Sequence, residues 1–149
     1  MQKRIKRLSI SAELGGLMCF MPGAMMEQRI TIKNNGQVWW TGVRNPTEKE
    51  IAAGILRYNK VKTSEYKNIG KGNAVRLLEK AQAILPSKIT AENQYICDAI
   101  PDWICIEYED GEVLSGESVD FSLSTFYEEI AEQVLIENLL FCENYDEYL

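Results

Sequence analysis

The segment Gln28–Val43 (QRITIKNNGQVWWTGV) constrains the fold more than any other part of the chain, because it has the pattern of a β-hairpin. Two runs rich in β-branched and aromatic residues flank Asn34-Asn35-Gly36. Gly36 can take the left-handed conformation that closes a three-residue hairpin loop. Since neighbouring side chains in a strand point to opposite faces, this register predicts one apolar face made of Ile30, Ile32, Val38 and Trp40. The opposite face is then predicted to hold Thr31, Lys33 and Trp39.

Trp39 is the residue whose position depends on the loop. A two-residue Asn-Gly loop would shift the register by one residue and turn Trp39 inward. In either register one tryptophan of the pair Trp39 and Trp40 faces away from the first layer of the core. That tryptophan is either covered by a helix or loop, or it is an exposed recognition anchor.

A second hairpin is predicted over Asp98–Gly116, with its turn at Asp110-Gly111. Trp103 opens the first of its two strands, and three residues are expected on the core-facing side: Ile104, Ile106 and Tyr108. Ile5–Ala12 is interpreted as a first strand with partial alternation, and Gly54–Tyr66 as a further strand. Asn45–Ala53 is expected to be a loop or a short helical turn, because Asn45-Pro46 favours a turn.

Two helices are predicted. Asn73–Leu85 carries apolar residues at helical spacing, with Asn73 as its cap and Pro86 as its stop. Thr125–Cys142 begins with a pattern that fits a capping box. Its expected core face holds Tyr127, Ile130, Ala131, Val134, Leu135 and Leu139. Together these elements predict an α+β fold in a single domain of residues 1–149: an antiparallel sheet from two hairpins and flanking strands, with two helices packed on one face.

Several apolar residues are left over once this core is filled. Ile136 and Leu140 lie four residues apart on the back of the predicted last helix, where either the tail Glu143–Leu149 or a partner would cover them. The uncharged segment Leu14–Met26 either folds over the core or forms a contact surface, and methionine suits both. The candidate partner contacts are therefore Met18, Phe20, Met21, Met25, Trp39, Ile136 and Leu140.

Charge is divided unevenly along the chain. Residues 1–88 hold all sixteen Lys and Arg with six Asp and Glu, whereas residues 89–149 hold sixteen Asp and Glu and no cation. A folded domain is expected to lay some of the basic strands against acidic ones. The remaining acidic charge is expected on one face of the last helix, formed by Glu128, Glu129, Glu132 and Glu137. A basic patch is expected in residues 57–71, from Arg57, Lys60, Lys62, Lys67 and Lys71, unless these charges only aid solubility.

The available chemistry is restricted because the chain has no histidine, which excludes Ser–His and Cys–His nucleophile systems within it. The four cysteines, Cys19, Cys97, Cys105 and Cys142, are widely spaced and are interpreted as reduced and buried. The nearest carboxylate pairs, Asp98 with Asp102 and Glu109 with Asp110, are interpreted as turn formers. Gly70–Asn73 could present amides to an anion, but a plain turn is favoured. No catalytic, cofactor or metal residues are assigned.

The layout of Ile30–Ile32, Gly36–Val38, Asp102-Trp103, Asp110-Gly111 and a closing helix resembles small uncharacterised α+β proteins of Gram-positive bacteria. The resemblance covers residues 28–141 loosely and implies no activity. The leading hypothesis is a cytoplasmic, non-catalytic binding module without cofactor, which contacts a partner protein or a second copy of itself. The alternatives are a nucleic-acid-binding protein that uses residues 57–71, although the acidic face opposes nucleic acid, and an enzyme that uses carboxylates or a metal. No segment has the ~20 apolar residues of a membrane span.

Overall fold

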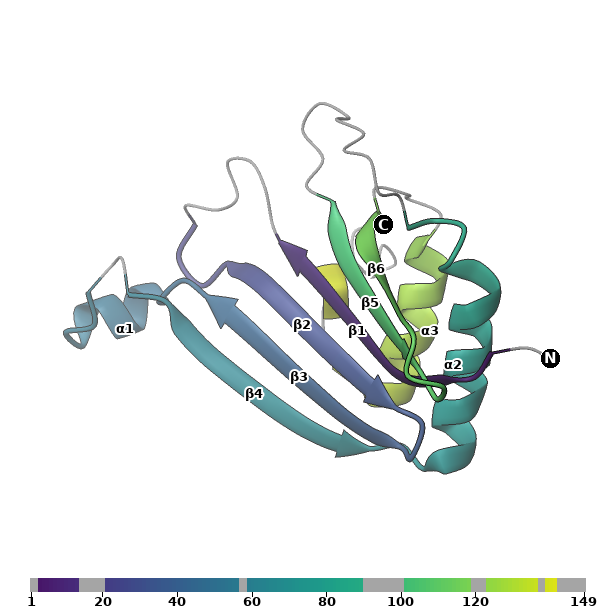
Figure 1. Cartoon of the computed structure of the whole chain (residues 1–149). Coiled ribbons are helices and arrows are strands. Elements are labelled where there is room, and N and C mark those ends of the chain that lie inside the picture. The colour runs from purple at the N-terminus through teal and green to yellow at the C-terminus, as the bar shows by residue number, and fades with distance from the viewer. Residues whose placement is uncertain are drawn as a thin grey trace.

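The computed structural model of the chain describes residues 3–13, 21–56, 59–89, 101–118, 123–136 and 139–141. The elements follow in the order β1 (Ile5–Glu13), β2 (Met25–Lys33), β3 (Gln37–Arg44), α1 (Glu48–Ala52), β4 (Val61–Asn68), α2 (Lys71–Ile84), β5 (Asp102–Tyr108), β6 (Val113–Ser118), α3 (Ser124–Val134) and the 3-10 helix η3 (Leu139–Phe141). The strands form one antiparallel sheet in the order β4-β3-β2-β1-β5-β6. Figure 1 shows α2 and α3 behind this sheet, which confirms the α+β fold.

The β2–β3 hairpin has the register that a three-residue loop requires. Ile30 pairs with Trp40, Ile32 with Val38, and Thr31 with Trp39. Gly36 has φ of 100° and its N–H bonds to the carbonyl of Lys33, so the loop needs a residue without a Cβ at this position. The prediction that Trp39 faces away from the core is therefore confirmed.

β1 lies at the centre of the sheet, between β2 and β5. The second hairpin joins β5 to β6 and turns at Asp110-Gly111 as predicted, with Ile104 opposite Gly116. Ile104, Ile106 and Tyr108 are buried, and Trp103 points to the other face of the sheet.

The core lies between one face of the sheet and the two longer helices. α2 contributes Ala74, Leu77, Leu78 and Ala81, and α3 contributes Phe126, Tyr127, Ile130 and Val134. These residues form one buried cluster with inward residues of β1, β2, β3 and β5. The opposite face of the sheet is not covered by any element of the described chain (Figure 1).

One buried polar residue joins the hairpin to the C-terminal part of the chain. The side-chain oxygen of Gln28 accepts a hydrogen bond from Trp40 Nε1 at 3.1 Å and one from the backbone N–H of Leu140 at 2.7 Å. Gly42 makes room for this arrangement, since a Cβ there would lie 2.6 Å from the indole ring of Trp40 and 2.9 Å from the sulfur of Met25. The Trp40 indole is thus held in a fixed place against β2.

The last helix is shorter than predicted. α3 begins at Ser124, after an N-cap at Leu123 that has no side-chain hydrogen bond, so the expected capping box at Thr125 is wrong. It ends where Leu135 takes the left-handed conformation, with φ of 55°. Leu135 is 78% exposed rather than part of the core face, whereas Leu139 is buried as predicted.

The boundaries of two other elements differ from the predictions. The fourth strand begins at Val61 rather than Gly54, and ahead of it the N–H of Asn59 donates to the carbonyl of Leu56 at 3.0 Å. α2 begins at Lys71, with Gly70 rather than Asn73 as its N-cap. A capping box does occur at Thr47 and Glu50, where it starts the short helix α1.

Ion pairs connect the basic and acidic parts of the sequence. Lys3 in front of β1 contacts Glu112, Arg7 of β1 lies 2.6 Å from Glu107 of β5, and Lys80 of α2 lies 2.7 Å from Glu129 of α3. The chain therefore lays basic segments against acidic ones, as the charge division led us to expect.

Candidate functional site: the open face of the sheet

The uncovered face of the sheet exposes several large aromatic and apolar side chains. Trp39 of β3 is 39% exposed, Tyr66 of β4 is 52% exposed and Trp103 of β5 is 45% exposed. Val113 of β6, which pairs with Glu107, is also exposed on this face. We call this surface, with Trp39, Tyr66 and Trp103 as its aromatic residues, the open face.

Two of the aromatic residues form a pair. Trp39 and Tyr66 occupy directly paired positions on β3 and β4, and their ring centroids are 5.2 Å apart with the planes tilted by 59°. Lys33 Nζ lies 4.9 Å from the centroid of the Trp39 ring, within cation–π distance. These neighbours cover part of the indole ring, so Trp39 lies under a lysine and beside a tyrosine, with neither a helix nor a loop of the described chain above it.

Small polar side chains lie between the Trp39–Tyr66 pair and Trp103. Ser9 of β1 and Thr31 of β2 share a hydrogen bond of 3.0 Å. Ser11 of β1 pairs with both Arg29 and Trp103 in the register. Trp39 and Trp103 are three strands apart, which corresponds to roughly 14 Å across the sheet. The open face is therefore a shallow surface with aromatic residues on both sides of a floor of hydroxyl groups.

The charges of the open face are distributed unequally between its two sides. The side formed by β2, β3 and β4 carries the basic residues Arg29, Lys33 and Lys62 and the acidic residue Glu27. On the β1, β5 and β6 side, Arg7 is paired with Glu107. Where the two sides meet, a depression of about 240 Å³ is lined by Lys6, Arg7, Lys33, Asn34, Asn35 and Glu107. The surface around the Trp39–Tyr66 pair is thus the more basic one.

The structure separates the predicted partner contacts. Ile136 and Leu140 are only 6% and 5% exposed and belong to the core, so they do not lie on the back of the last helix, and of the two alternatives a partner contact there is excluded. The physical reason is that the left-handed residue Leu135 ends the helix, and that the 3-10 helix η3, which contains Leu140, packs against β1 and β2. Met18 and Phe20 lie outside the described residues. Of the remaining contacts, Met21 is exposed, Met25 packs against the core beside Trp40, and Trp39 lies on the open face.

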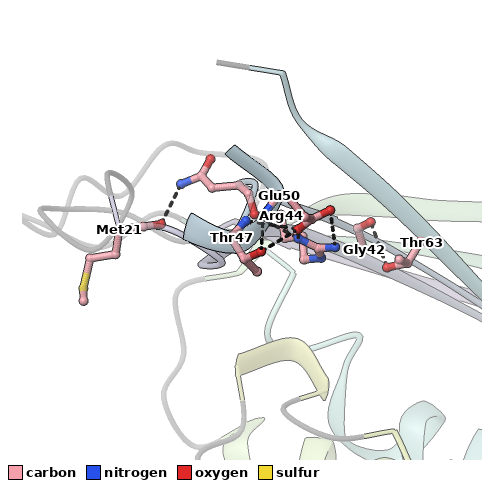
Figure 2. Close-up of polar contacts among 7 residues, drawn as sticks. Met21, Gly42, Arg44, Thr47, Glu50 and Thr63 are labelled. Carbon is pink, nitrogen blue, oxygen red and sulfur yellow. Dashed lines mark hydrogen bonds and ion pairs between the residues drawn. The ribbon is translucent and has the colours of Figure 1, made fainter. Parts of the chain in front are cut away.

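The end of the sheet beside Met21 is held by a polar cluster, drawn in Figure 2. Arg44 donates to both carboxylate oxygens of Glu50, at 2.5 and 3.3 Å. The Thr47 hydroxyl caps α1 by accepting from the Glu50 backbone N–H at 3.2 Å, and the Glu50 carboxylate accepts in return from the Thr47 N–H at 3.1 Å. The Arg44 guanidinium, followed by the backbone N–H of Thr47, lowers the pKa of Glu50 from 4.5 to about 2. Buried Asn45 donates to the carbonyl of Met21 at 3.1 Å and accepts from Lys60. We interpret this cluster as structural, since each of its charged groups has a partner.

The predicted acidic face is only partly free. Glu129 is paired with Lys80, whereas Glu128 and Glu132 are exposed and Glu137 lies outside the described residues. A depression of about 530 Å³ runs between α2 and α3 and is lined by Asn73, Arg76, Leu77, Glu79, Lys80, Ala83, Glu129, Glu132 and Gln133. Its charges have both signs, so it does not form a single acidic surface.

The basic residues 57–71 are also dispersed. Lys60 bonds to Asn45, and Lys67 lies 3.7 Å from Glu65. Lys62 is exposed on the open face and Lys71 lies in the first turn of α2. Arg57 lies outside the described residues. Lys62 is thus the member of the predicted patch that joins the aromatic surface.

The carboxylates and cysteines do not gather in the described part of the chain. Burial raises the pKa of Asp102, whose carboxylate accepts a 2.7 Å hydrogen bond from the Tyr127 hydroxyl, and this bond opposes the shift. Glu109 and Asp110 occupy the exposed β5–β6 turn. Asp98, Cys19, Cys97 and Cys142 lie outside the described residues. No group of three or more Asp, Glu, Cys or His that could hold a metal is found among the residues described.

Sequence reasoning identified Trp39 but missed Tyr66 and Trp103 as members of the same surface. A signal for Trp103 was present, because the alternation that buries Ile104 and Ile106 places Trp103 on the opposite face. Tyr66 could be placed only from the β3–β4 register. No helix in the described ranges is long and apolar enough to cross a membrane. Comparison with family models, curated proteins and solved structures finds no match to this chain.

Proposed function

We propose that the protein is a non-catalytic binding module whose open face contacts a partner protein in the cytoplasm. The observation that supports this proposal is the exposure of Trp39, Tyr66 and Trp103 on one uncovered sheet face. Tryptophan and tyrosine are enriched among the residues that dominate the energy of protein interfaces. Small polar residues such as Ser9 and Thr31 lie between the Trp39–Tyr66 pair and Trp103, a mixed composition that suits a surface that also stays in water when unbound.

The proposal is tested by affinity capture from native cell extract with matched variants. One variant replaces Trp39 and Trp103 by alanine, and a control replaces Leu56 and Leu135, which are exposed and belong to no strand of the sheet. A partner that binds through the open face should be captured by the wild type and the control and lost with the tryptophan variant. Equal capture by all three proteins would show that the open face is not the contact surface.

A second candidate function is binding of single-stranded nucleic acid on the β2, β3 and β4 side of the open face. Arg29, Lys33 and Lys62 around the Trp39–Tyr66 pair support it, since single strands are bound by stacking on aromatic rings beside cations. Titration of the protein with an unstructured oligonucleotide should then quench tryptophan fluorescence, with an affinity that falls as salt is raised. Lys62→Ala should weaken this binding and Lys49→Ala, in the exposed part of α1, should not. A fluorescence signal that does not change would exclude this candidate.

A further inference from the structure

We propose that the free edge of β4 pairs with the β4 edge of a second copy of this chain, in antiparallel orientation and centred on Ser64. This pairing goes beyond the proposed function and does not depend on it, because it is made by the backbone groups of an edge strand, whether or not the open face binds a partner.

The first observation is that β4 is a long edge strand with regular geometry. It is the outermost strand on one side of the sheet. Its eight residues pair with β3 without a register shift, from Asn68 opposite Gln37 to Val61 opposite Arg44. Lys62 through Tyr66 are all exposed. Natural sheets usually protect such an edge with a bulge, a proline, charged side chains such as lysine, or a covering segment. β4 does carry Lys62 and Lys67, but Glu65 lies between them, so its charges have both signs. β4 contains no proline, and no described element covers it, so its outer backbone groups are available for pairing.

The hydrogen-bond pattern identifies the backbone groups that point to the open edge. The N–H of Ile69 donates to the carbonyl of Gly36 at 3.0 Å, next to the Gln37–Asn68 pair. In an antiparallel ladder, bonded and non-bonded pairs alternate. Lys67, Glu65, Thr63 and Val61 therefore bond to β3. The N–H and C=O groups of the intervening residues point away from the sheet: Lys62, Ser64, Tyr66 and Asn68.

This pattern limits the registers that a two-fold pair can adopt. In a hydrogen-bonded pair across the two copies, both residues must have their backbone N–H and C=O groups pointing away from β3. The side chains of two residues that face each other must also lie on the same face of the sheet. A pair centred on Glu65 would place the two Glu65 carboxylates opposite each other, which is unfavourable. A pair centred on Tyr66 overlaps the strand over residues 64–68 only.

The pair centred on Ser64 uses residues 61–67 and opposes no like charges. Ser64 then faces its own copy, Lys62 faces Tyr66, Thr63 faces Glu65, and Val61 faces Lys67. The Lys62 side chain would cover the exposed Tyr66 ring of the other copy, as Lys33 covers Trp39 within one chain. The charges of β4 thus allow self-pairing centred on Ser64 and disfavour the register centred on Glu65. In the Ser64-centred pair the two open faces would become one continuous surface.

The association is tested on the purified full chain by sedimentation velocity over a broad protein concentration range. The wild type should form a concentration-dependent dimer. Ser64→Pro should weaken it by at least about tenfold, because each copy loses an outward N–H that would bond across the two-fold axis. This N–H makes no bond to β3, so circular dichroism and thermal unfolding should show an intact monomer. Ser64→Thr keeps the N–H and should still dimerise.

A cross-linking experiment tests the register and remains informative if Ser64→Pro fails to fold. Two Ser64 residues in a bonded antiparallel pair have Cα atoms about 5.5 Å apart, within the range of a disulfide. Ser64→Cys should form a covalent dimer under mild oxidation, more than the wild type does. Thr41→Cys, one strand further from the axis on the same face, should not. A wild type that stays monomeric throughout, a dimer that Ser64→Pro does not weaken, or a Ser64→Cys variant that fails to cross-link would overturn the inference. None of these results bears on capture of a partner by the open face.

Discussion

At the scale of single residues, Gln28 is the side chain on which the hairpin and the C-terminal segment both depend. Replacement by methionine keeps much of its volume but leaves the indole N–H of Trp40 and the N–H of Leu140 without their acceptor. Each buried donor left unsatisfied costs about 1–3 kcal/mol. We therefore expect Gln28→Met to lower the free energy of unfolding by about 2–4 kcal/mol in urea denaturation. Gln133→Met, on the exposed side of α3, should change it by less than about 0.5 kcal/mol.

Glu50 gives a second prediction at this scale, which concerns pH. Its pKa is lowered to about 2 in the folded protein by Arg44 and Thr47. A carboxyl with a lowered pKa stabilises the fold above its ordinary pKa, and this stabilisation is lost as pH falls from about 4.5 to about 2. Glu50→Gln should remove that part of the acid dependence, whereas Glu48→Gln, which leaves the cap intact, should keep it. NMR titration of the Glu50 carboxyl checks the pKa directly, and a midpoint near 4.5 would contradict the prediction.

At the scale of elements, the end of α3 is the boundary that differs most from the one predicted from the sequence. Leu135 is left-handed and 78% exposed, a conformation that glycine adopts at helix ends without the penalty of a Cβ. Leu135→Gly is expected to raise the free energy of unfolding by about 0.5–1 kcal/mol. Glycine at Gln133, inside the same helix, should lower it by about 1 kcal/mol. Thermal unfolding of the two variants should therefore shift in opposite directions.

The same contrast explains which elements the sequence could predict. The β2–β3 hairpin was predictable in register, because Gly36 and the alternation of Ile30, Ile32, Val38 and Trp40 specify one loop and one inward face. The end of α3 was not, because residues 135–140 continue a helical apolar pattern and contain no glycine or proline. Tertiary burial of Ile136 and Leu140 against the sheet overrides that local pattern. The open face was half predictable, since its membership depends on pairings between strands far apart in sequence.

At the scale of the whole molecule, the division of charge along the chain becomes a set of contacts between its two parts. Lys3, Arg7 and Lys80 each meet an acid from beyond residue 100. The sequence predicted that such contacts would form, but not which acids would remain free. Glu129 forms an ion pair with Lys80, so the exposed acidic surface of the last helix is smaller than its composition implied. The open face, in contrast, is basic only near the Trp39–Tyr66 pair, and this local charge differs in sign from that of the whole chain.

The pairing of the two parts can be measured as a coupling between Lys80 and Glu129, which lie 2.7 Å apart on α2 and α3. Lys80→Glu alone should destabilise the protein, because it places like charges side by side between the helices. Combining it with Glu129→Lys restores an opposite pair and should recover part of the loss. Since both side chains are partly exposed, the coupling energy of the cycle should be only about 0.2–1 kcal/mol. It should shrink in about 1 M salt, where the Debye length is about 3 Å. Strictly additive effects in low salt would mean that this ion pair does not help to hold the helices together, and that α2 and α3 are joined by apolar packing.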